Sequence, residues 1–251
     1  MPQKAPHLVF TPRSPQVNPD MYVRRAALEE RLMDAFVSNK FIVIHGESGN
    51  GKTWLYKKVF AENAIHFEVI NLGQVAMAGS LGAAFSHKLG EWGYKEKVAE
   101  GTNSSGGVKP AGIGVEHGMS SSSQIATKSP FLALLEQSRR RATGDARAAL
   151  ILDNFEAIVD NNAFVQEIAG LILSADDESV AQYNIQIIIV GVPNNLKETI
   201  VQLSNSAPVS NRLVEIPEVA RMNAQEAAEL IKKDSWTRLV SFCLPISMKM
   251  F

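Results

Sequence analysis

The chain has 251 residues, of which 45% are hydrophobic and 20% charged, so it can form one α/β domain of ordinary size with a small appendage. Its formal net charge of -1 gives no overall attraction to nucleic acid or to an anionic membrane, and any such partner would have to be held by a local patch. The single cysteine, Cys243, excludes an internal disulfide and fits a reducing compartment. No stretch reaches the roughly 20 apolar residues of a membrane helix. We therefore expect a cytoplasmic protein without a membrane partner.

The first predicted element is an amphipathic helix that leads out of an N-terminal segment, residues 1–35. In the stretch VRRAALEERLMDAF, one face carries Leu28, Leu32, Ala35 and Phe36. The charged residues, Glu29 among them, are expected on the other faces. The helix should pack one side on a core that begins near residue 36.

Short β-branched runs then alternate with helical patterns. The runs are FIVIH (41–45), HFEVINL (66–72), AALILD (148–153) and IQIIIVGV (185–192). Such alternation predicts an α/β fold in which helices cover both faces of a mostly parallel sheet.

The loop GESGNGKTW follows the first run directly and fits the pattern G-x-x-x-x-G-K-[ST]. Glycines let consecutive N–H groups turn toward phosphate oxygens, Lys52 neutralises the β- and γ-phosphates, and the Thr53 hydroxyl is offered to Mg²⁺. A plain turn is the alternative, but the helical pattern that follows would aim its positive end at an anion. The predicted nucleotide-binding residues are Gly46, Glu47, Ser48, Gly49, Asn50, Gly51, Lys52, Thr53 and Trp54.

A Gly- and Ser-rich stretch at residues 99–129 has too few large apolar residues to build core. It is expected to be a mobile surface insertion, with a partner-binding or pore-facing loop as the alternative.

An acidic residue, Asp153, ends the run ALILD. A phosphate-binding loop needs such an acid, on a neighbouring strand, to orient the metal. We therefore predict Thr53 and Asp153 as Mg²⁺ ligands. A strand-end residue that caps a turn is the alternative for Asp153.

These two motifs together resemble the AAA+ superfamily, and within it the initiator-like and STAND-like ATPases, over approximately residues 10–233. The resemblance implies a P-loop NTPase three-layer sandwich with a five-stranded sheet and a partial helical lid. MYVRRAALEERL is similar to the family segment ahead of the loop and places Arg25 at its arginine position, as a nucleotide-binding residue. VSNRLVEIPEV places Arg212 where the family often carries an arginine finger.

The chain also departs from the family. Asn154 stands where many AAA+ enzymes have a catalytic glutamate directly after the metal-binding aspartate. Glu156 is the candidate to polarise the attacking water, with a surface residue as the alternative. Asn194 or Asn195 could supply the polar sensor residue, or could belong to a turn after Pro193.

The domain organisation predicted from these motifs has a P-loop core at 36–222 and a partial lid or truncated tail at 223–251. The helical spacing kept up to Lys233 stops at Asp234, and the last residues contain Pro245. An extended segment packed on the sheet edge is the alternative for this tail.

The predicted function is that of an ATPase that couples binding and hydrolysis of Mg-ATP to a conformational change in a partner or a missing domain. The alternative is a nucleotide-dependent switch or scaffold that does not hydrolyse. ATP is favoured because no N-K-x-D guanine motif occurs, and a protein partner or self-association is expected. Nucleic acid is possible but unsupported, since the arginines at 139–141 and Arg147 lack interleaved aromatic residues.

Overall fold

Five parallel strands form the centre of the molecule. A computed structural model describes residues 16–19, 21–38, 40–94, 128–144, 147–192, 196–204 and 207–232. The sheet has the order β2-β3-β4-β1-β5, and every pairing in it is parallel. The strands are β1 (Phe41–His45), β2 (His66–Asn71), β3 (Ala148–Asp153), β4 (Ile185–Gly191) and β5 (Leu213–Glu215). The predicted α/β fold with a five-stranded sheet is confirmed.

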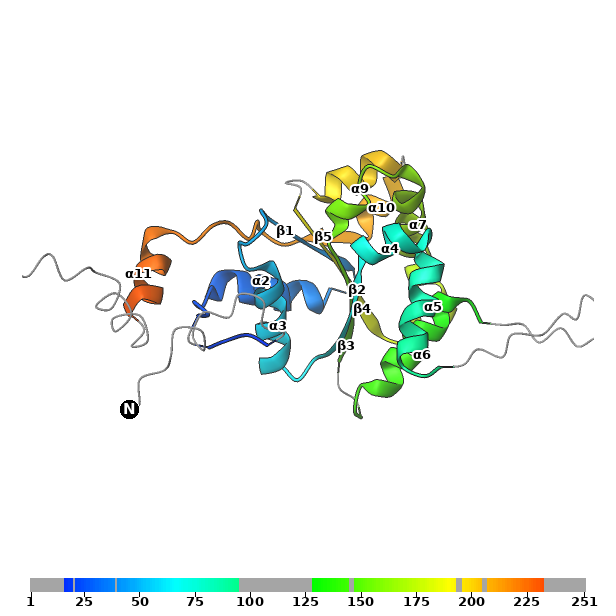
Figure 1. Ribbon diagram of the computed structural model, residues 1–251, viewed down its shortest axis with the longest axis horizontal. Helices are drawn as coiled ribbons and strands as arrows, with labels where there is room; N and C mark the ends of the chain where they lie inside the picture. The colour runs from blue at the N-terminus through cyan, green and yellow to red at the C-terminus, as the bar shows by residue number, and fades with distance from the viewer. Residues whose placement is uncertain are drawn as a thin grey trace, which may run out of the picture.

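Helices cover both faces of this sheet, which gives three layers (Figure 1). One face carries α2 (Ala26–Phe36) and α3 (Lys52–Glu62). The other face carries α4 (Leu72–Ala78), α5 (Leu81–Glu91), α6 (Pro130–Arg141), α7 (Asn162–Leu173), α9 (Leu196–Ser204) and α10 (Ala207–Asn211). Shorter elements are η1 (Phe155–Ala157), η2 (Ser174–Asp176) and α8 (Glu178–Ala181), and α11 (Ala224–Lys232) follows β5.

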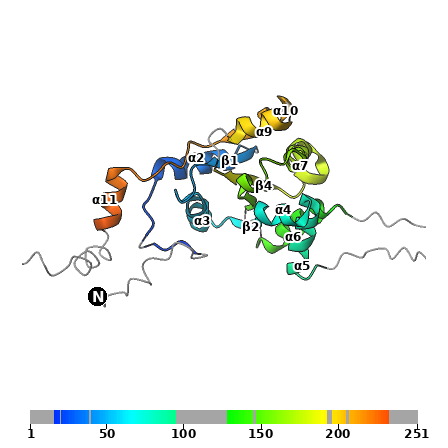
Figure 2. The same ribbon diagram turned by 45° about the horizontal axis from the view of Figure 1, so that its top comes forward.

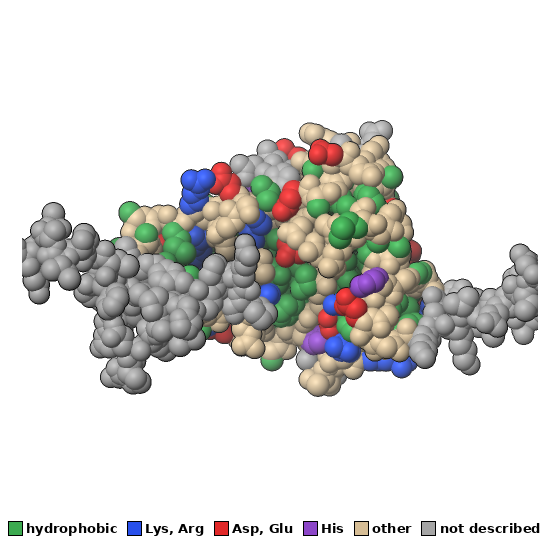
Figure 3. Space-filling view, viewed as in Figure 1, with side chains coloured by type: hydrophobic (Ala, Val, Ile, Leu, Met, Phe, Trp, Pro, Cys, Tyr) green, Lys and Arg blue, Asp and Glu red, His purple; other side chains and the backbone are tan. Residues whose placement is uncertain are grey.

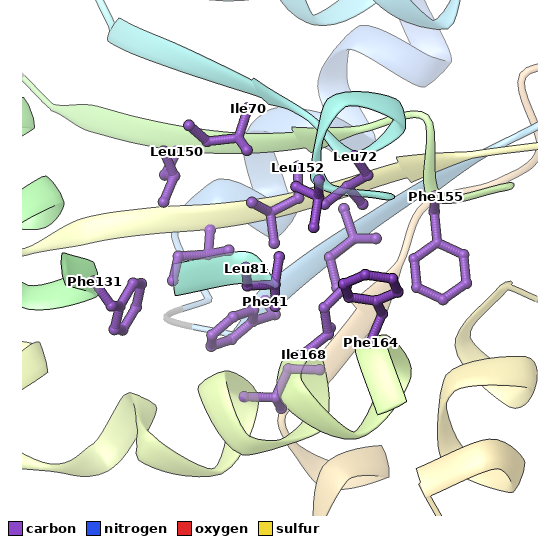
Figure 4. Close-up of a cluster of buried hydrophobic side chains, with 14 of the residues drawn as sticks. Phe41, Ile70, Leu72, Leu81, Phe131, Leu150, Leu152, Phe155, Phe164 and Ile168 are labelled. Carbon is purple, nitrogen blue, oxygen red and sulfur yellow. The ribbon is translucent and has the colours of Figure 1, made fainter. Parts of the chain in front are cut away.

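Alternate residues of the strands build two apolar cores, because successive side chains of a strand point to opposite faces. In β1, Ile42 and Ile44 pack with α2 and α3, whereas Phe41 and Val43 pack with the helices of the other face. Figure 4 shows the second core, where Leu150 and Leu152 of β3 face aromatic side chains of the helix layer. All five residues of β1 are buried, which explains why this strand has no polar alternation in the sequence.

The strand order corrects one expectation about the candidate site. Asp153 was expected on a strand next to β1, but β4 lies between β1 and β3. Sequence order does not reveal this, because β4 follows β3 in the chain and enters the sheet between two earlier strands. The loop after β1 and the acid at the end of β3 still meet at one edge, since all strands are parallel and end on the same side.

The expectation for Glu29 was wrong. Its side chain is buried, with a relative exposure of 6%, although it belongs to the charged residues of α2. Its carboxylate accepts hydrogen bonds from the Tyr22 hydroxyl (2.8 Å), from Nε of Arg24 (3.2 Å) and from the backbone N–H of Arg25 (3.1 Å). A carboxylate in the first turn satisfies free amide donors there and interacts favourably with the helix dipole.

The last described helix, α11, stands apart from the layers in both views and is reached through an extended segment after β5 (Figures 1 and 2). Residues 95–127 and 233–251 lie outside the described residues, so the predictions for most of the 99–129 insertion and for the tail fall there. Among the helices that the structure describes, none is both long and apolar enough to cross a bilayer.

Candidate functional site

The loop after β1 has a backbone that requires its glycines. Gly46 has φ +146°, and a Cβ atom on it would lie 2.4 Å from the carbonyl oxygen of Val219. Gly51 caps α3 with φ 93°, in the left-handed region. The loop therefore ends at the N-terminus of α3, where free N–H groups and the helix dipole favour an anion.

The ammonium group of Lys52 lies on the inner side of this loop. Its Nζ donates hydrogen bonds to the carbonyl oxygens of Gly46 (2.6 Å) and Glu47 (3.0 Å). Burial lowers the pKa of Lys52, and the negative charges of Glu156 and Asp153 oppose this shift. Lys52 is thus close enough to both carboxylates for their charges to affect its pKa.

Asp153 and Thr53 come together through a third side chain, Tyr56. The Tyr56 hydroxyl donates to Oδ2 of Asp153 at 3.4 Å, and the Thr53 side chain lies near enough to lower the pKa of this phenol. Tyr56 itself is buried, with 1% exposure. Burial raises the pKa of Asp153, and the charge of Glu156 raises it further, so a cation here would offset an unfavourable negative charge.

The donor set fits Mg²⁺. A carboxylate and a hydroxyl are hard oxygen ligands, which Mg²⁺ prefers, and Mg²⁺ is commonly held by one or two carboxylates together with phosphates of the substrate. Within the described part of the chain, no group of three or more His, Cys, Asp or Glu side chains could hold a metal ion alone. Thr53 and Asp153 would therefore need oxygens from a bound phosphate to complete the coordination.

Glu156 lies near the same edge, in η1 just after β3. Its Oε2 accepts a hydrogen bond from the backbone N–H of Val192 (3.2 Å), directly after β4. The side chain is exposed, which leaves it open to solvent water. Asn194 and Asn195, the two sensor candidates, lie outside the described residues.

Asn154, at the position where many AAA+ enzymes have a glutamate, makes contacts that join two strand ends. It adopts the left-handed conformation, with φ 64° and ψ 49°. Its amide donates to Oδ1 of Asn71 (3.0 Å), which also accepts from the backbone N–H of Gly73 (2.9 Å). Asn154 therefore ties the end of β3 to the end of β2.

The Arg25 side chain contacts backbone carbonyl oxygens of the loop and of the segment after β5. Nη1 donates to the carbonyl oxygens of Asn50 (3.3 Å) and Ala220 (2.8 Å), and Nε lies 3.5 Å from Oε1 of Glu226.

The tip of the loop makes further contacts with the segment after β5. Nδ2 of Asn50 donates to the Val219 carbonyl (3.1 Å), and Glu47 pairs with Arg221 (2.7 Å).

Arg212 lies at the amino-terminal ends of the strands, on the side of the sheet opposite to the loop. It directly precedes β5, whose first residue, Leu213, pairs with Phe41 at the start of β1. Its guanidinium forms an ion pair with Asp176 (2.7 Å) and donates to the Pro208 carbonyl (3.2 Å). Asp176 also lines a cavity of about 510 Å³ at this amino-terminal edge. Arg212 is therefore remote from the loop of its own chain.

The basic cluster before β3 makes several contacts within the chain, two of them with carboxylates. Arg140 pairs with Glu136, Arg141 pairs with Glu68 (3.0 Å) and stacks over Trp92, and Arg139 donates to the Gly144 carbonyl (2.8 Å). On the face shown in Figure 3, acidic and basic side chains are intermixed. These contacts fit a solvated helix end.

Sequence reasoning missed Tyr56, Asn71 and Val219. Tyr56 follows Thr53 by one turn of α3, so helical spacing could have placed both on one side. Asn71 ends a strand, as Asp153 does, which is a usable signal at the carboxyl edge of a parallel sheet. The Val219 carbonyl offers no such signal, because a backbone contact does not depend on the side chain.

Comparisons with known proteins agree with this geometry. Residues 37–200 match the family model described as AAA domain. A protein of Drosophila melanogaster, ATPase family AAA domain-containing protein 3A homolog, is 30% identical over 80 residues, which are 28% of this chain and 13% of that protein.

Two solved structures share the fold. A Walker-type ATPase of Pyrococcus abyssi has a TM-score of 0.56 at 13% identity, with 93% of this chain and 63% of that chain covered. The ORC2 protein of Aeropyrum pernix in its ADP form has a TM-score of 0.57 at 16% identity, with 90% and 55% covered. The chain thus spans less than two thirds of the length of each of these proteins. Since the family model matches more than half of its residues, the chain belongs to the AAA domain family.

Proposed function

We propose that the chain binds Mg-ATP on the loop at residues 46–54 and hydrolyses it. The observation that carries this proposal is the position of Tyr56, whose hydroxyl interacts with both Thr53 and Asp153. The two halves of the expected site come from segments far apart in the sequence. Their meeting around one buried hydroxyl supports a shared ligand.

In this proposal the loop and the start of α3 hold the phosphates. Backbone N–H groups and Lys52 bind the phosphate oxygens, and Lys52 exchanges its present carbonyl partners for them. Thr53 and Asp153 hold Mg²⁺, which when bound offsets charge on the transferring phosphoryl group.

Glu156 is the proposed general base. Water attacks the γ-phosphorus, the bond between that phosphorus and the bridging oxygen breaks, and Glu156 accepts the proton from the water. The products are ADP and inorganic phosphate. The Val192 N–H holds the Glu156 carboxylate at the carboxyl edge of the sheet, where Asp153 also lies.

A nucleotide switch without turnover is the second candidate. Asn154 is engaged with Asn71 and cannot act as a base, and Glu156 already accepts a hydrogen bond. Both observations favour a site that binds better than it hydrolyses.

The remaining parts of the proposal concern partners. The distance of Arg212 from its own loop supports a role across an interface with another molecule, and therefore self-association. We propose a core at 36–222, with 223–251 as part of a lid whose movement transmits the nucleotide state to a partner. The single Cys243 supports a reducing compartment such as the cytoplasm.

Lys52→Ala tests the function. The variant should lose ATP binding in calorimetry and phosphate release, while its thermal unfolding stays close to that of the parent, because Lys52 contacts the loop and not the core. Lys57→Ala, in the same helix, is the matched control and should behave as the parent does. Equal ATP affinity in the parent and in Lys52→Ala would contradict the proposal.

A further inference from the structure

Arg25 connects three segments that are far apart in the sequence. It is the N-cap residue of α2, and its guanidinium donates to the loop tip at Asn50 and to Ala220 in the segment after β5. The same group pairs with Glu226 in the first turn of α11. The Arg25 side chain has an exposure of only 11%.

Glu226 has two roles at the start of α11. Its Oε2 accepts from the backbone N–H of Asn223 (2.8 Å), while the Asn223 side chain accepts from the N–H of Glu226 (2.9 Å). This reciprocal pair is a capping box, which fixes the first turn of a helix. Oε1 of Glu226 remains for Arg25, so the ion pair fixes the beginning of α11 relative to the loop.

The rest of α11 depends on few contacts with the core. Residues 224–230, the part of α11 whose burial is described, are exposed or half-buried, and both views show the helix away from the sheet and its covering helices (Figures 1 and 2). A helix held mainly at its first turn can dock and undock at low cost, because little apolar surface is involved. Its position then depends on Arg25.

We propose that Arg25 is a positioning residue that latches α11 to the tip of the loop and does not itself bind the nucleotide. When Arg25 makes these contacts, Asn50 and Gly46 are held against the segment at residues 219–220. The loop then already has the curved shape that binds phosphate. This inference rests on the proposed function for its consequence in ATP binding. The latch itself is a property of the chain without nucleotide.

The coupling between ATP binding and the docking of α11 can be measured at either site, because it is reciprocal. If the docked state of α11 favours the loop that binds ATP, then ATP must favour the docked state of α11 by the same factor. Such couplings are commonly about fivefold or more. A change on α11 that leaves the loop intact should therefore weaken ATP binding.

The first experiment uses the whole protein without nucleotide. In Glu226→Gln the capping box is retained, because glutamine can accept from Asn223, but the charge that pairs with Arg25 is removed. Hydrogen exchange should quicken in α11 and also at the loop amide of Asn50, whereas amides of β1 and β4 keep their protection. Unchanged exchange at Asn50 would overturn the latch, whether or not the chain binds ATP.

The second experiment measures ATP affinity by calorimetry in Arg25→Ala, Glu226→Gln and the double variant. Each single variant should bind ATP about fivefold or more weakly, and the double variant should be no weaker than the weaker single one. Additive losses, or tighter binding, would overturn the coupling. Arg25→Lys should give only partial rescue, because one ammonium cannot reproduce the planar fork that reaches two carbonyls and a carboxylate.

Arg24→Ala is the matched control, since Arg24 is a neighbouring, exposed arginine that pairs with the buried Glu29 and not with the loop. It should leave exchange in α11 and ATP affinity at the parental level. If the parent binds no ATP, the proposed function fails, and the exchange experiment alone decides about the latch.

Discussion

The hydroxyl of Tyr56 lies 3.4 Å from Oδ2 of Asp153 and joins the helix after the loop to the end of β3. Burial of Tyr56 and the charge of Asp153 raise the pKa of this phenol, so it stays protonated and acts as a donor. The strand β4 separates β1 from β3 in the sheet, and Tyr56 reaches Asp153 from the helix that covers one face of these strands. Tyr56 therefore links one carboxylate oxygen to the helix after the loop, while the other, Oδ1, accepts from the backbone N–H of Asn154 (2.9 Å).

Tyr56→Phe should weaken Mg²⁺-dependent ATP binding while the protein stays folded. Outer partners of a metal ligand typically contribute about tenfold or more to metal affinity, and the long hydrogen bond here suggests the lower end of that range. Calorimetric titration of ATP at several Mg²⁺ concentrations measures the effect. Tyr183→Phe removes a hydroxyl far from the loop and should bind as the parent does; equal behaviour of both variants would remove Tyr56 from the site.

Asp153→Asn should raise the melting temperature near neutral pH when Mg²⁺ is absent. The pKa of Asp153 is raised in the folded state, so ionising this carboxyl destabilises the fold above that raised pKa and has no effect below the ordinary value. The advantage of the variant should shrink as the pH falls through this window. Thermal unfolding from pH 3 to pH 8 tests this, and a variant less stable than the parent at neutral pH would contradict it.

The same variant, Asp153→Asn, should respond less to Mg²⁺. Adding Mg-ATP should raise the melting temperature of the parent, because a ligand that binds only the folded state stabilises it. The variant should gain less. An equal gain in both proteins would show that Asp153 does not hold the metal.

Glu156→Gln should slow hydrolysis and spare ATP binding. A general base contributes about 10² to 10⁴ in rate, so single-turnover phosphate release should fall by that factor. Asp160→Asn, which neutralises an exposed acid a few residues away, serves as the control. Turnover at the parental rate in Glu156→Gln would make Glu156 a bystander and favour the switch without hydrolysis.

Arg212→Ala should leave ATP affinity unchanged and lower turnover only where molecules associate. An arginine acting across an interface contributes about 10³ or more in rate. Asp176→Asn should have the opposite effect, because it frees Arg212 from its intramolecular ion pair. Turnover measured against protein concentration decides; rates independent of both concentration and Arg212 would exclude the role across an interface.

The parts of this molecule that could be predicted are those with a local cause. The run at 41–45 is a strand because it is β-branched, and the loop after it is bounded by glycines that the backbone needs at Gly46 and Gly51. The burial of Glu29 could not be predicted from the helical pattern because one of its donors, Tyr22, lies outside the helix. The separation of β3 from β1 was missed because a late strand enters between them.

The contacts around the loop could not be predicted from the sequence for a related reason. The Val219 carbonyl approaches Gly46 so closely that no Cβ fits, yet any residue at position 219 would carry the same carbonyl. The guanidinium of Arg25 likewise donates to two backbone carbonyls and pairs with Glu226, contacts that its motif does not reveal. Periodicity and motifs describe side chains, so they cannot show contacts that the main chain makes.

The central position of β1 has a consequence for how the chain is made. This strand is synthesised first, yet both of its sheet neighbours, β4 and β5, come late in the sequence. At ordinary rates of translation, on the order of ten seconds pass before Ile185–Gly191 can pair with it. During that time FIVIH is an apolar segment with two unpaired edges on a nascent chain, the kind of segment that a chaperone binds.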